Sequence, residues 1–573
     1  MKKQNLRSYA LIAVAAATTV ACNPLNNMTK RAEEVTYSVT PDPLEMHADS
    51  IEISISGAIP PRFFNKKVSV DITPVLNYQE TETSFRKITL VGEDSEVEGI
   101  KIAYEGGGNF SHVTKIPYQE GMDQAVLNAV AVGKYKGNEK TFDPKQIATG
   151  TIVTPMWVED DYVFALGADQ FQKTYPKSNS AEINYLVNSS QVRSSELRDE
   201  DVKALNEWIK ENADHPMFAF KGGEVVAYAS PEGELSINEN LAEDRAKSGS
   251  SSVRNMLRRA GEKESSKEGF FKLSPKGEDW DGFKKAMQAS DIKDKDLILR
   301  VLEMYEDKSK REEEIRNLAE TFEVLKDEIL PGLRRSMITV NGEMTSFSDE
   351  KIMEFSKSNP DTLSAEELLY AATMTDDLDE KGRIYKKFSE LFPNDWRGPN
   401  NVGYIMALNG DMDAAKAEFD KAASLEPENG VILNNLGVYA QSTGDVEKAM
   451  EHYEKSGISE AGANAGAIHI SRGEYAEAVN SFGTLKSFNS ALAKTLNGDY
   501  QEAVTTIDES PSAEDAKSAY LKAVIGARQG DKNATVTNLK AAVAADASLK
   551  AKAKTDAEFT AYFDDAEFQA AVN

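Results

Sequence analysis

The stretch NNVGYIMALNGDMDAAKAEF, from Asn400 to Phe419, returns as NNLGVYAQSTGDVEKAMEHY from Asn434 to Tyr453. Four pairs of small or aromatic residues lie 34 residues apart in these copies: Gly403 and Gly437, Gly410 and Gly444, Ala415 and Ala449, Phe419 and Tyr453. A constant period of this length indicates an array of helical units, in which each unit buries its apolar face against the next.

The period and the residue set resemble tetratricopeptide repeats, which carry small residues where two helices touch and an aromatic residue in the second helix. The same step upstream leads to Tyr370, Tyr385 and Pro393, which make an earlier copy. Downstream, RGEYAEAVNSF and NGDYQEAVTTI keep the signature, but the glycine spacing shrinks to 29 and then 25 residues. We predict an all-α repeat domain over residues 346–573, with five or six units from Leu363 to Ala545, short first helices where the period shrinks, and a small terminal cap.

Repeat arrays expose a long concave surface that holds peptides or partner helices. Asn401 and Asn435 occupy a first-helix position at which some peptide-binding arrays of this kind hold a backbone. Two interpretations are open, partner binding or hydrogen bonds that merely join neighbouring repeats, and the second is favoured. A spacer array without a specific ligand is a further alternative.

The N-terminal part of the chain has the pattern of β-strands. SIEISISGAI, KVSVDITPVLNY, GIKIAYEGGG and GTIVTPMWV alternate apolar and polar residues between Gly, Pro and Asn. Short strands at regular spacing predict an antiparallel β-sandwich over residues 35–160. No residue in it indicates a chemical role.

Strands and helices alternate over residues 161–345. AEINYLVNSSQV and MFAFKGGEVVAYAS read as strands, each is followed by a segment of helical periodicity, and LRRSMITV reads as a returning strand. Between them, residues 262–330 are rich in lysine and glutamate with apolar residues at helical spacing, which predicts a helical insertion. The region is therefore an α+β domain.

The segment YASPEGELSINENLAEDRA, from Tyr228 to Ala246, carries the spacing of a known motif. Counting from Ser230, the motif positions hold Gly233, Asn238, Leu241, Arg245 and Ala246. This resembles the OmpA-like domain, which holds peptidoglycan in Gram-negative envelopes. The resemblance implies a pocket for the diaminopimelate side chain, with an arginine on its carboxylate and an aspartate on its ammonium.

Ser230 stands where that family has aspartate, and a hydroxyl cannot neutralise an ammonium. The turn offers Glu232 and Glu234 as substitutes, and Arg245 could still bind the ligand carboxylate. In the alternative, Arg245 bonds a carboxylate of its own domain and Gly233 only serves the turn. Loss of one partner from a desolvated charge pair costs about 2–5 kcal/mol, which is enough to remove a modest affinity.

The first residues of the sequence predict a targeting signal. Lys2, Lys3 and Arg7 precede the apolar run YALIAVAAATTVA, which is too short to span a membrane and ends at Cys22, the single cysteine of the chain. Thr-Val-Ala-Cys resembles the lipobox of bacterial lipoproteins, whose cysteine carries diacylglycerol after cleavage. Residues 1–21 are thus predicted as a signal peptide and residues 22–34 as a lipidated linker. An ordinary cleaved signal with a chance cysteine is the alternative.

Composition and motifs exclude several classes of function. The 94 acidic and 66 basic residues give a net charge of −28, which argues against binding to nucleic acid. None of the five histidines forms a pair with zinc-binding spacing, and no nucleophile motif is present. We expect no catalytic residues, no metal, no cofactor and no enzymatic activity.

The sequence therefore predicts a multidomain lipoprotein that acts as a scaffold. Its expected partners are outer-membrane lipid, through acylated Cys22, and one or more envelope proteins, through the repeat array. The expected location is the periplasmic face of the outer membrane. The alternative is a peptidoglycan-binding linker between the outer membrane and the cell wall.

Overall fold

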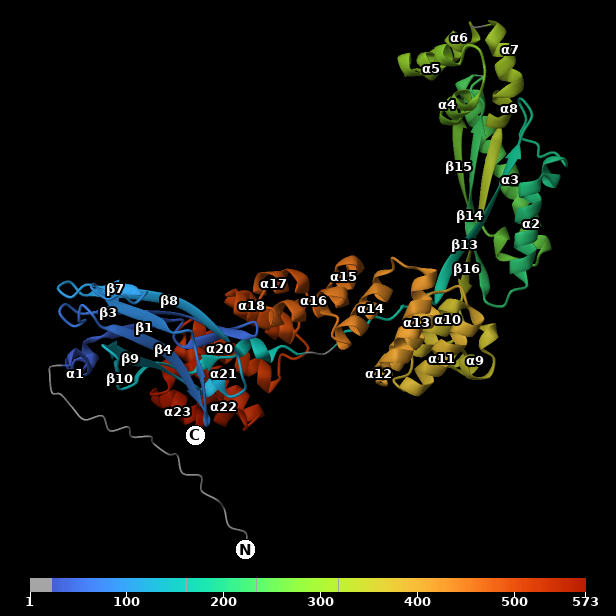
Figure 1. Cartoon of the computed structure of the whole chain (residues 1–573). Coiled ribbons are helices and arrows are strands. Elements are labelled where there is room, and N and C mark those ends of the chain that lie inside the picture. Colours follow the sequence, from blue (N-terminus) through green and yellow to red (C-terminus); the bar gives the residue numbers. More distant parts are fainter. Residues whose placement is uncertain (1–22, 160–161, 233, 318) are drawn as a thin grey trace. The chain divides into compact units, whose positions relative to one another are not determined.

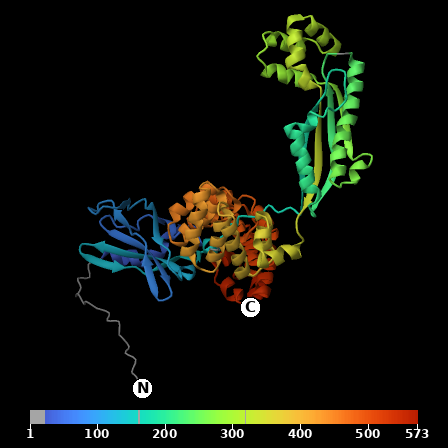
Figure 2. The same ribbon diagram turned by 90° about the vertical axis from the view of Figure 1, so that its right-hand side faces the viewer.

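The computed structural model describes residues 23–159, 162–232, 234–317 and 319–573. Cys22, Gly233 and the predicted signal peptide lie outside these ranges. The chain divides into two compact units, one of residues 1–167 with 394–573 and one of residues 168–393. The chain is multidomain, with an N-terminal β-rich region and a C-terminal all-helical array of tetratricopeptide type (Figures 1 and 2).

The first unit begins with a β-rich domain. Its elements are α1 (Pro24–Lys30), η1 (Ala32–Glu34), β1 (Thr36–Thr40), β2 (Leu44–His47), β3 (Ser50–Ile59), β4 (Ser69–Tyr78), β5 (Thr81–Ser84), β6 (Ile88–Gly92), β7 (Ile100–Ile102), β8 (Gly108–Pro117), η2 (Met122–Gln124), β9 (Val126–Tyr135), β10 (Asn138–Thr141), β11 (Lys145–Thr149), β12 (Thr151–Ile152) and η3 (Thr154–Trp157). One sheet has the order β1-β3-β2-β12 with β8 beside β3, and the other has the order β10-β9-β4-β6-β7 with β11 on β9 and β5 on β4.

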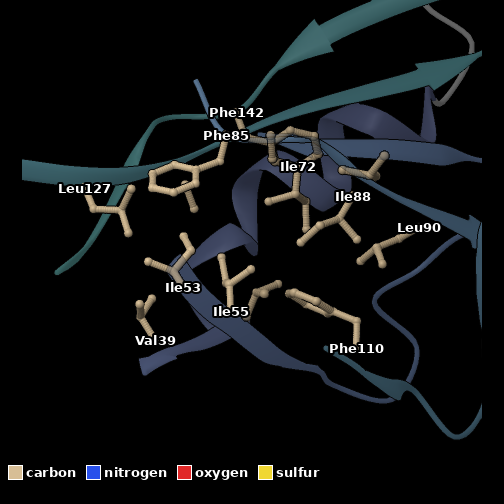
Figure 3. Packing of buried hydrophobic residues seen from close by; sticks show 14 of the residues in the cluster. Val39, Ile53, Ile55, Ile72, Phe85, Ile88, Leu90, Phe110, Leu127 and Phe142 are labelled. Atoms are coloured by element: carbon tan, nitrogen blue, oxygen red, sulfur yellow. The ribbon is translucent and has the colours of Figure 1, made fainter. Parts of the chain in front are cut away.

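The two sheets enclose one apolar core. In β3 the isoleucines at positions 51, 53 and 55 alternate with polar residues and are at most 1% exposed, because successive side chains point to opposite faces. Core residues from both sheets pack together (Figure 3). The prediction of a purely antiparallel sandwich was wrong in two places, since β12 pairs parallel to β2 and β7 pairs parallel to β6. GTIVTPMWV is not one strand either, because η3 follows the two residues of β12.

Residues 22–34 are not a simple linker, because α1 lies within them. The Asn23 side chain accepts a hydrogen bond from the Leu25 amide, and Pro24 fits the first helical turn. Leu25 and Met28 are 0% and 2% exposed and belong to the core of the β-rich domain. Part of the predicted linker is therefore an integral helix of this domain.

The remainder of the first unit is helical. The helices are α12 (Arg397–Leu408), α13 (Met412–Leu425), α14 (Gly430–Ser442), α15 (Val446–Ser456), α16 (Ser459–Ser471), α17 (Tyr475–Phe482), α18 (Phe488–Asn497), α19 (Tyr500–Asp508), α20 (Ala516–Arg528), α21 (Lys532–Ala545), α22 (Leu549–Ala553), η7 (Ala557–Tyr562) and α23 (Ala566–Val572). Helices α12 to α21 form consecutive pairs. The last three elements follow as a cap.

The repeated residues have direct packing roles. A Cβ at Gly403 would lie 2.7 Å from the Phe419 ring, and one at Gly437 would lie 2.5 Å from the Tyr453 ring. The glycine and the aromatic residue therefore recur together, because only a residue without a side chain leaves room for the ring. Gly444 turns between helices with φ +85°, and Asp445 next to it caps α15 by accepting from the Lys448 amide.

The predicted short first helices explain only part of the shrinking period. The first helix α16 has 13 residues, as many as α14, so it is not short. Instead the second helices shorten, from 14 residues in α13 to 8 in α17 and 9 in α19, and α18 is the one shortened first helix, with 10. Glycine spacing in the sequence could not tell which helix of a pair had lost residues.

The β-rich domain packs on the last repeats. Glu558 of η7 accepts from Thr154 Oγ1 at 2.5 Å and from the Arg528 guanidinium at 2.6 Å, and its side chain is 1% exposed. The ring of His47 meets that of Tyr475 edge to face, with centroids 5.2 Å apart. A buried, fully bonded carboxylate thus joins the two domains of this unit.

The second unit is built on one four-stranded sheet. Its elements are β13 (Thr174–Asn184), η4 (Glu196–Arg198), α2 (Glu200–Ala213), β14 (Phe218–Ala229), α3 (Leu235–Arg259), η5 (Glu264–Ser266), β15 (Phe271–Glu278), α4 (Trp280–Ala289), α5 (Lys295–Met304), α6 (Lys308–Arg316), α7 (Ala319–Glu328), α8 (Leu330–Leu333), β16 (Arg335–Thr345), α9 (Asp349–Ser358), η6 (Pro360–Thr362), α10 (Ala365–Thr373) and α11 (Leu378–Leu391). The strand order is β13-β16-β14-β15, and only β14 and β15 are parallel. Figure 1 shows α2 and α3 along the sheet and α4 to α8 at one end of it.

Residues 262–330 are not wholly helical, because β15 lies inside them. Lys272 and Lys276 of this edge strand face solvent and interrupt the alternation by which a strand is recognised. The helical insertion therefore starts at α4, and it has a separate apolar cluster around Phe283, Met287 and Leu325. The strand predicted from Ala181 begins seven residues earlier, at Thr174, where its side chains are exposed.

Candidate interaction site of the repeat array

Four asparagines form a row along successive first helices of the array. They are Asn401 in α12, Asn435 in α14, Asn464 in α16 and Asn489 in α18, and we call them the asparagine ladder. The first three are at most 3% exposed. A buried amide needs hydrogen-bond partners, since an unpaired polar group costs about 1–3 kcal/mol.

The partners are backbone groups of the chain that follows the β-rich domain. Each ladder amide accepts from the N–H and donates to the C=O of one residue, as a neighbouring β-strand would. The N–H and C=O contacts are 2.8 and 2.8 Å for Asn489 with Glu159, 2.9 and 2.9 Å for Asn464 with Val163, 2.8 and 2.8 Å for Asn435 with Ala165, and 2.7 and 2.9 Å for Asn401 with Gly167. We call Glu159 together with residues 162–167 the held segment.

The ladder also joins neighbouring repeats. Asn435 Nδ2 lies 3.0 Å from Asn400 Oδ1, and Asn464 Nδ2 lies 3.0 Å from Asn434 Oδ1. The favoured interpretation, hydrogen bonds between neighbouring repeats, is therefore confirmed, and Asn401 and Asn435 in addition bind a backbone. The backbone that they bind belongs to the same chain.

Side chains of the held segment fit the array as well. The Phe164 ring lies between Tyr404 and Phe419, with centroids 6.3 and 6.4 Å away. At Gly167 a Cβ would lie only 2.7 Å from Arg397 Cγ, so this position has no room for a side chain. Lys517 pairs with the Glu159 carboxylate at 2.9 Å.

The held segment shifts a predicted domain boundary. The β-rich domain was expected to end at residue 160 and the α+β domain to begin at residue 161, yet Val163, Ala165 and Gly167 bind the repeats. Strand β13 begins only at Thr174. The connection between the two predicted domains is thus a ligand of the repeat array.

Asn464 and Asn489 were not predicted, although the sequence carries the signal. Asn464 follows Asn435 by 29 residues and Asn489 follows Asn464 by 25. These distances equal the shrunken glycine spacings of the same repeats. Extending the asparagine position with the observed spacing, instead of a constant 34, would have found both.

The second unit brings most of the predicted pocket residues to one end of β14 and to α3. Ser230 and Asn238 are 3% and 4% exposed, and Leu241 is partly buried. Glu232 Oε1 lies 2.5 Å from Ser230 Oγ and 2.8 Å from Arg334 Nε. A carboxylate thus occupies the position next to Ser230, and an arginine of the same unit neutralises it.

Arg245 is the largest fully buried side chain, with 1% exposure. Its guanidinium donates to the backbone carbonyls of Ser189, Tyr228 and Leu186 at 3.0, 2.9 and 3.3 Å. Burial lowers the pKa of Arg245 to about 10. The alternative that it bonds a carboxylate of its own domain is wrong, since its partners are carbonyls.

Asn238 contacts a further buried acid. Its Nδ2 lies 3.0 Å from Glu278 Oε1, and Trp280 Nε1 donates to Glu278 Oε2 at 2.8 Å. Glu278 ends β15, the parallel neighbour of β14. Ser230 with Glu232, Asn238 with Glu278, and Arg245 with three carbonyls are thus all hydrogen-bonded within the unit.

No set of three or more His, Cys, Asp or Glu side chains in the described residues has a metal-binding arrangement. Among the helices of the described ranges, none has the length and apolar character that crossing a bilayer requires.

Comparisons with known proteins bear on the array. A family profile described as tetratricopeptide repeat matches residues 400–429 and 431–456. No curated protein sequence matches the chain.

Solved structures with a partial likeness include PilF of Pseudomonas aeruginosa (13% identity, TM-score 0.27), which covers 39% of this chain and 97% of its own. The match to the Cut9–Hcn1 hetero-tetramer of the APC/C has 16% identity and a TM-score of 0.30, and it covers 55% of this chain and 62% of that one. The match to YrrB, described as a TPR protein with an unusual peptide-binding site, has 17% identity and a TM-score of 0.20, and it covers 36% of this chain and 99% of that one. The C-terminal region of this chain carries tetratricopeptide repeats, which suggest a protein–protein interaction scaffold.

Proposed function

We propose that the protein is a lipid-anchored scaffold of the bacterial envelope whose repeat array binds a protein partner. The asparagine ladder carries this proposal. Its amides recognise the backbone of an extended chain and require no particular side chain, which is the property of a surface that holds polypeptide. The scaffold acts by holding other molecules in place, without catalysis.

The held segment defines where a partner can bind. Because the ladder amides are bonded to the chain itself, the partner has to use other surfaces of the array or displace this segment. Two depressions of about 560 and 300 Å³ lie on helices α13 to α16. Arg472 lines the larger one and Tyr439 the smaller one, and Asp445 lines both. We assign the partner to this pair of depressions.

Site-specific photocrosslinking in cells tests the assignment. A photoreactive phenylalanine at Tyr439 or Arg472 is expected to capture a discrete protein, which mass spectrometry then identifies. The same group at Lys67, an exposed residue of the β-rich domain, is the matched control. Adducts that are absent at all three positions, or identical at all three, would contradict the proposal.

The lipid anchor is part of the proposal and has its own test. Native protein should partition into the detergent phase of an envelope extract, and Cys22→Ser should stay in the aqueous phase. Protease treatment of whole cells reports the membrane face. Survival of the protein in intact cells supports the periplasmic face of the outer membrane, and its loss contradicts it.

A contact with peptidoglycan through an OmpA-like domain is the second candidate. The observation that favours it is the Glu232 carboxylate beside Ser230, which supplies the negative charge that a serine lacks. A ligand ammonium would replace the Arg334 guanidinium on this carboxylate, and its carboxylate would approach Arg245. The protein would then link the outer membrane to the cell wall.

Sedimentation with purified sacculi separates the two functions. The intact protein should pellet, Glu232→Gln should lose most of the pelleting, and Glu234→Gln, an exposed position two residues away, should keep it. Arg245→Ala should also abolish pelleting, but it removes three buried hydrogen bonds, so its fold has to be checked by circular dichroism. An intact protein that stays in the supernatant rules this candidate out.

A further inference from the structure

The β-rich domain contains a pocket that has no part in the proposed function. It has a volume of about 250 Å³ and lies between the two sheets at the end covered by α1. Its deep walls are apolar and come from both sheets, with Ile59, Val70, Ile72, Leu90 and Phe142 among them, and Figure 3 labels three of these. Met28 of α1 also lines the pocket and is 2% exposed.

Small side chains keep the pocket open. Ala129 and Ala131 of β9 line it, at positions of an inner face where other strands carry isoleucine, valine or leucine. Ala131 pairs with Ile72 across β4 and β9, so a larger residue here would project into the same space. Protein interiors rarely contain empty apolar volumes of this size, because packing is close to that of organic crystals.

The rim of the pocket is charged. Lys30, Glu33, Asp143 and Lys145 line it, and all except the partly buried Lys145 are exposed. Lys145 Nζ donates to the Val35 carbonyl at 3.0 Å and lies 3.8 Å from Glu33. Lys30 is therefore the cation of the rim that can meet a new anion.

We propose that this pocket binds the hydrocarbon chain of a fatty acid, with the carboxylate at Lys30. Since an apolar cavity of about 150 Å³ holds benzene with its six carbons, the pocket has room for about ten carbons. An apolar interior with a charged mouth fits an amphiphile better than a fully polar ligand, because each buried methylene adds to affinity and the head group stays in water.

The chain could come from two sources, a free fatty acid or the acyl group expected on Cys22. Cys22 lies two residues before α1, and α1 carries Met28, Thr29 and Lys30 of the lining. The chemistry is the same in both cases. Comparing the native chain with its Cys22→Ser variant distinguishes them.

Calorimetric titration with decanoate tests the pocket. We expect saturable binding of one decanoate per delipidated full-length chain, at least tenfold weaker binding by Ala131→Leu, and about threefold weaker binding by Lys30→Gln. Ala103→Leu, an exposed position of the same domain outside the pocket, should bind as the native chain does. Binding by both the native chain and Cys22→Ser indicates a free fatty acid, and binding by Cys22→Ser alone indicates that the lipid on Cys22 fills the pocket.

Ala129→Leu serves as a second filled variant in case Ala131→Leu fails to fold, and thermal unfolding of each variant reports the fold. The proposal is overturned if neither the native chain nor Cys22→Ser binds decanoate. It is also overturned if a folded Ala131→Leu or Ala129→Leu variant, made in whichever of these two chains binds decanoate, binds it as tightly as that parent chain. These outcomes are independent of any result at the repeat array.

Discussion

At the scale of single residues, Asn435 uses the full hydrogen-bonding capacity of one side-chain amide. Its Oδ1 accepts from the Ala165 amide at 2.8 Å and from Asn434 at 3.1 Å, and its Nδ2 donates to the Ala165 carbonyl at 2.8 Å and to Asn400 at 3.0 Å. Aspartate could not donate and leucine could do neither. The position therefore requires an amide side chain, for the repeat stack and for the held segment alike.

Asn435→Ala should expose the held segment. It leaves the buried amide of Ala165 unpaired, at a cost of about 1–3 kcal/mol, while the Ala165 carbonyl keeps only its 3.3 Å contact with Asn400. Hydrogen exchange followed by mass spectrometry should show faster exchange over residues 162–167. The control is Asn409→Ala, at an exposed position directly after α12. Equal exchange of residues 162–167 in both variants would refute the assigned role.

Gly167→Ala tests the fit of the segment from the opposite side. The added methyl group would meet Arg397 Cγ at 2.7 Å and the Trp396 ring at 3.1 Å. We expect a loss of about 1–3 kcal/mol in the free energy of unfolding, measured with urea. Gly106→Ala, whose Cβ would meet nothing within 4 Å, should change stability by far less.

At the scale of elements, one carboxylate of β4 is bonded to side chains of the segments that flank it in the sheet, β6 and β9. Asp71 of β4 accepts from Thr89 Oγ1 at 2.7 Å, and Lys87 and Lys134 lie 2.9 and 3.2 Å away. Burial alone would raise the pKa of Asp71, but these three hydrogen bonds hold the pKa below its ordinary value of 3.8. Hydrogen bonds and ion pairs of Asp71 thus connect three neighbouring strands on the outer face of this sheet.

The carboxylate gives the β-rich domain a pH dependence of known sign. Because the folded pKa is depressed, the contribution of Asp71 is complete above about pH 4 and is lost as the pH falls through the folded pKa. Asp71→Asn should cost about 1 kcal/mol at neutral pH, since water screens the two exposed lysines. The difference between variant and native unfolding should shrink below pH 4, and a difference that stays constant at low pH would show that the charge is not responsible.

At the scale of the molecule, the Glu558 carboxylate at the end of the array pairs with Arg528 of the array and accepts a hydrogen bond from Thr154 of the β-rich domain. The side chains of Arg528 and Glu558 are 18% and 1% exposed, and Thr154 bonds the same carboxylate. The nearby carboxylates of Glu558 and Glu45 outweigh burial and raise the pKa of Arg528. The domain contact therefore depends on a charge that has no access to water.

Glu558→Gln should weaken this contact strongly. It leaves Arg528 buried without its counter-charge, which typically costs about 3–5 kcal/mol. Arg528→Met combined with Glu558→Leu should cost less than either single change, because no charge is then left alone. Differential scanning calorimetry of the full chain measures the three variants, and additive losses in the double variant would disprove the coupling.

Local patterns predicted the elements that depend on neighbouring residues. The 34-residue step located the repeats, because a glycine facing an aromatic ring occurs in both α12–α13 and α14–α15, and period-two apolar residues located β3 and β4. The same rules missed β15, whose exposed lysines break the alternation. They assigned the shortening of the repeats to the first helices, which is right for α18 but misses the residues lost from the second helices α15 and α17. The asparagine position was recognised in two repeats, while the changing period hid the other two.

The sequence alone determined the helix pairs, the β-rich domain and the candidate residues, because capping, periodicity and side-chain volume act over a few residues. Only the tertiary structure decided that the ladder holds residues 159 and 162–167, that Arg245 serves backbone carbonyls, and that a pocket remains between the two sheets. The ladder contacts connect residues more than 230 positions apart, such as Gly167 and Asn401. Backbone amides look alike in every residue, so no pattern in the sequence marks which of them a distant asparagine will bind.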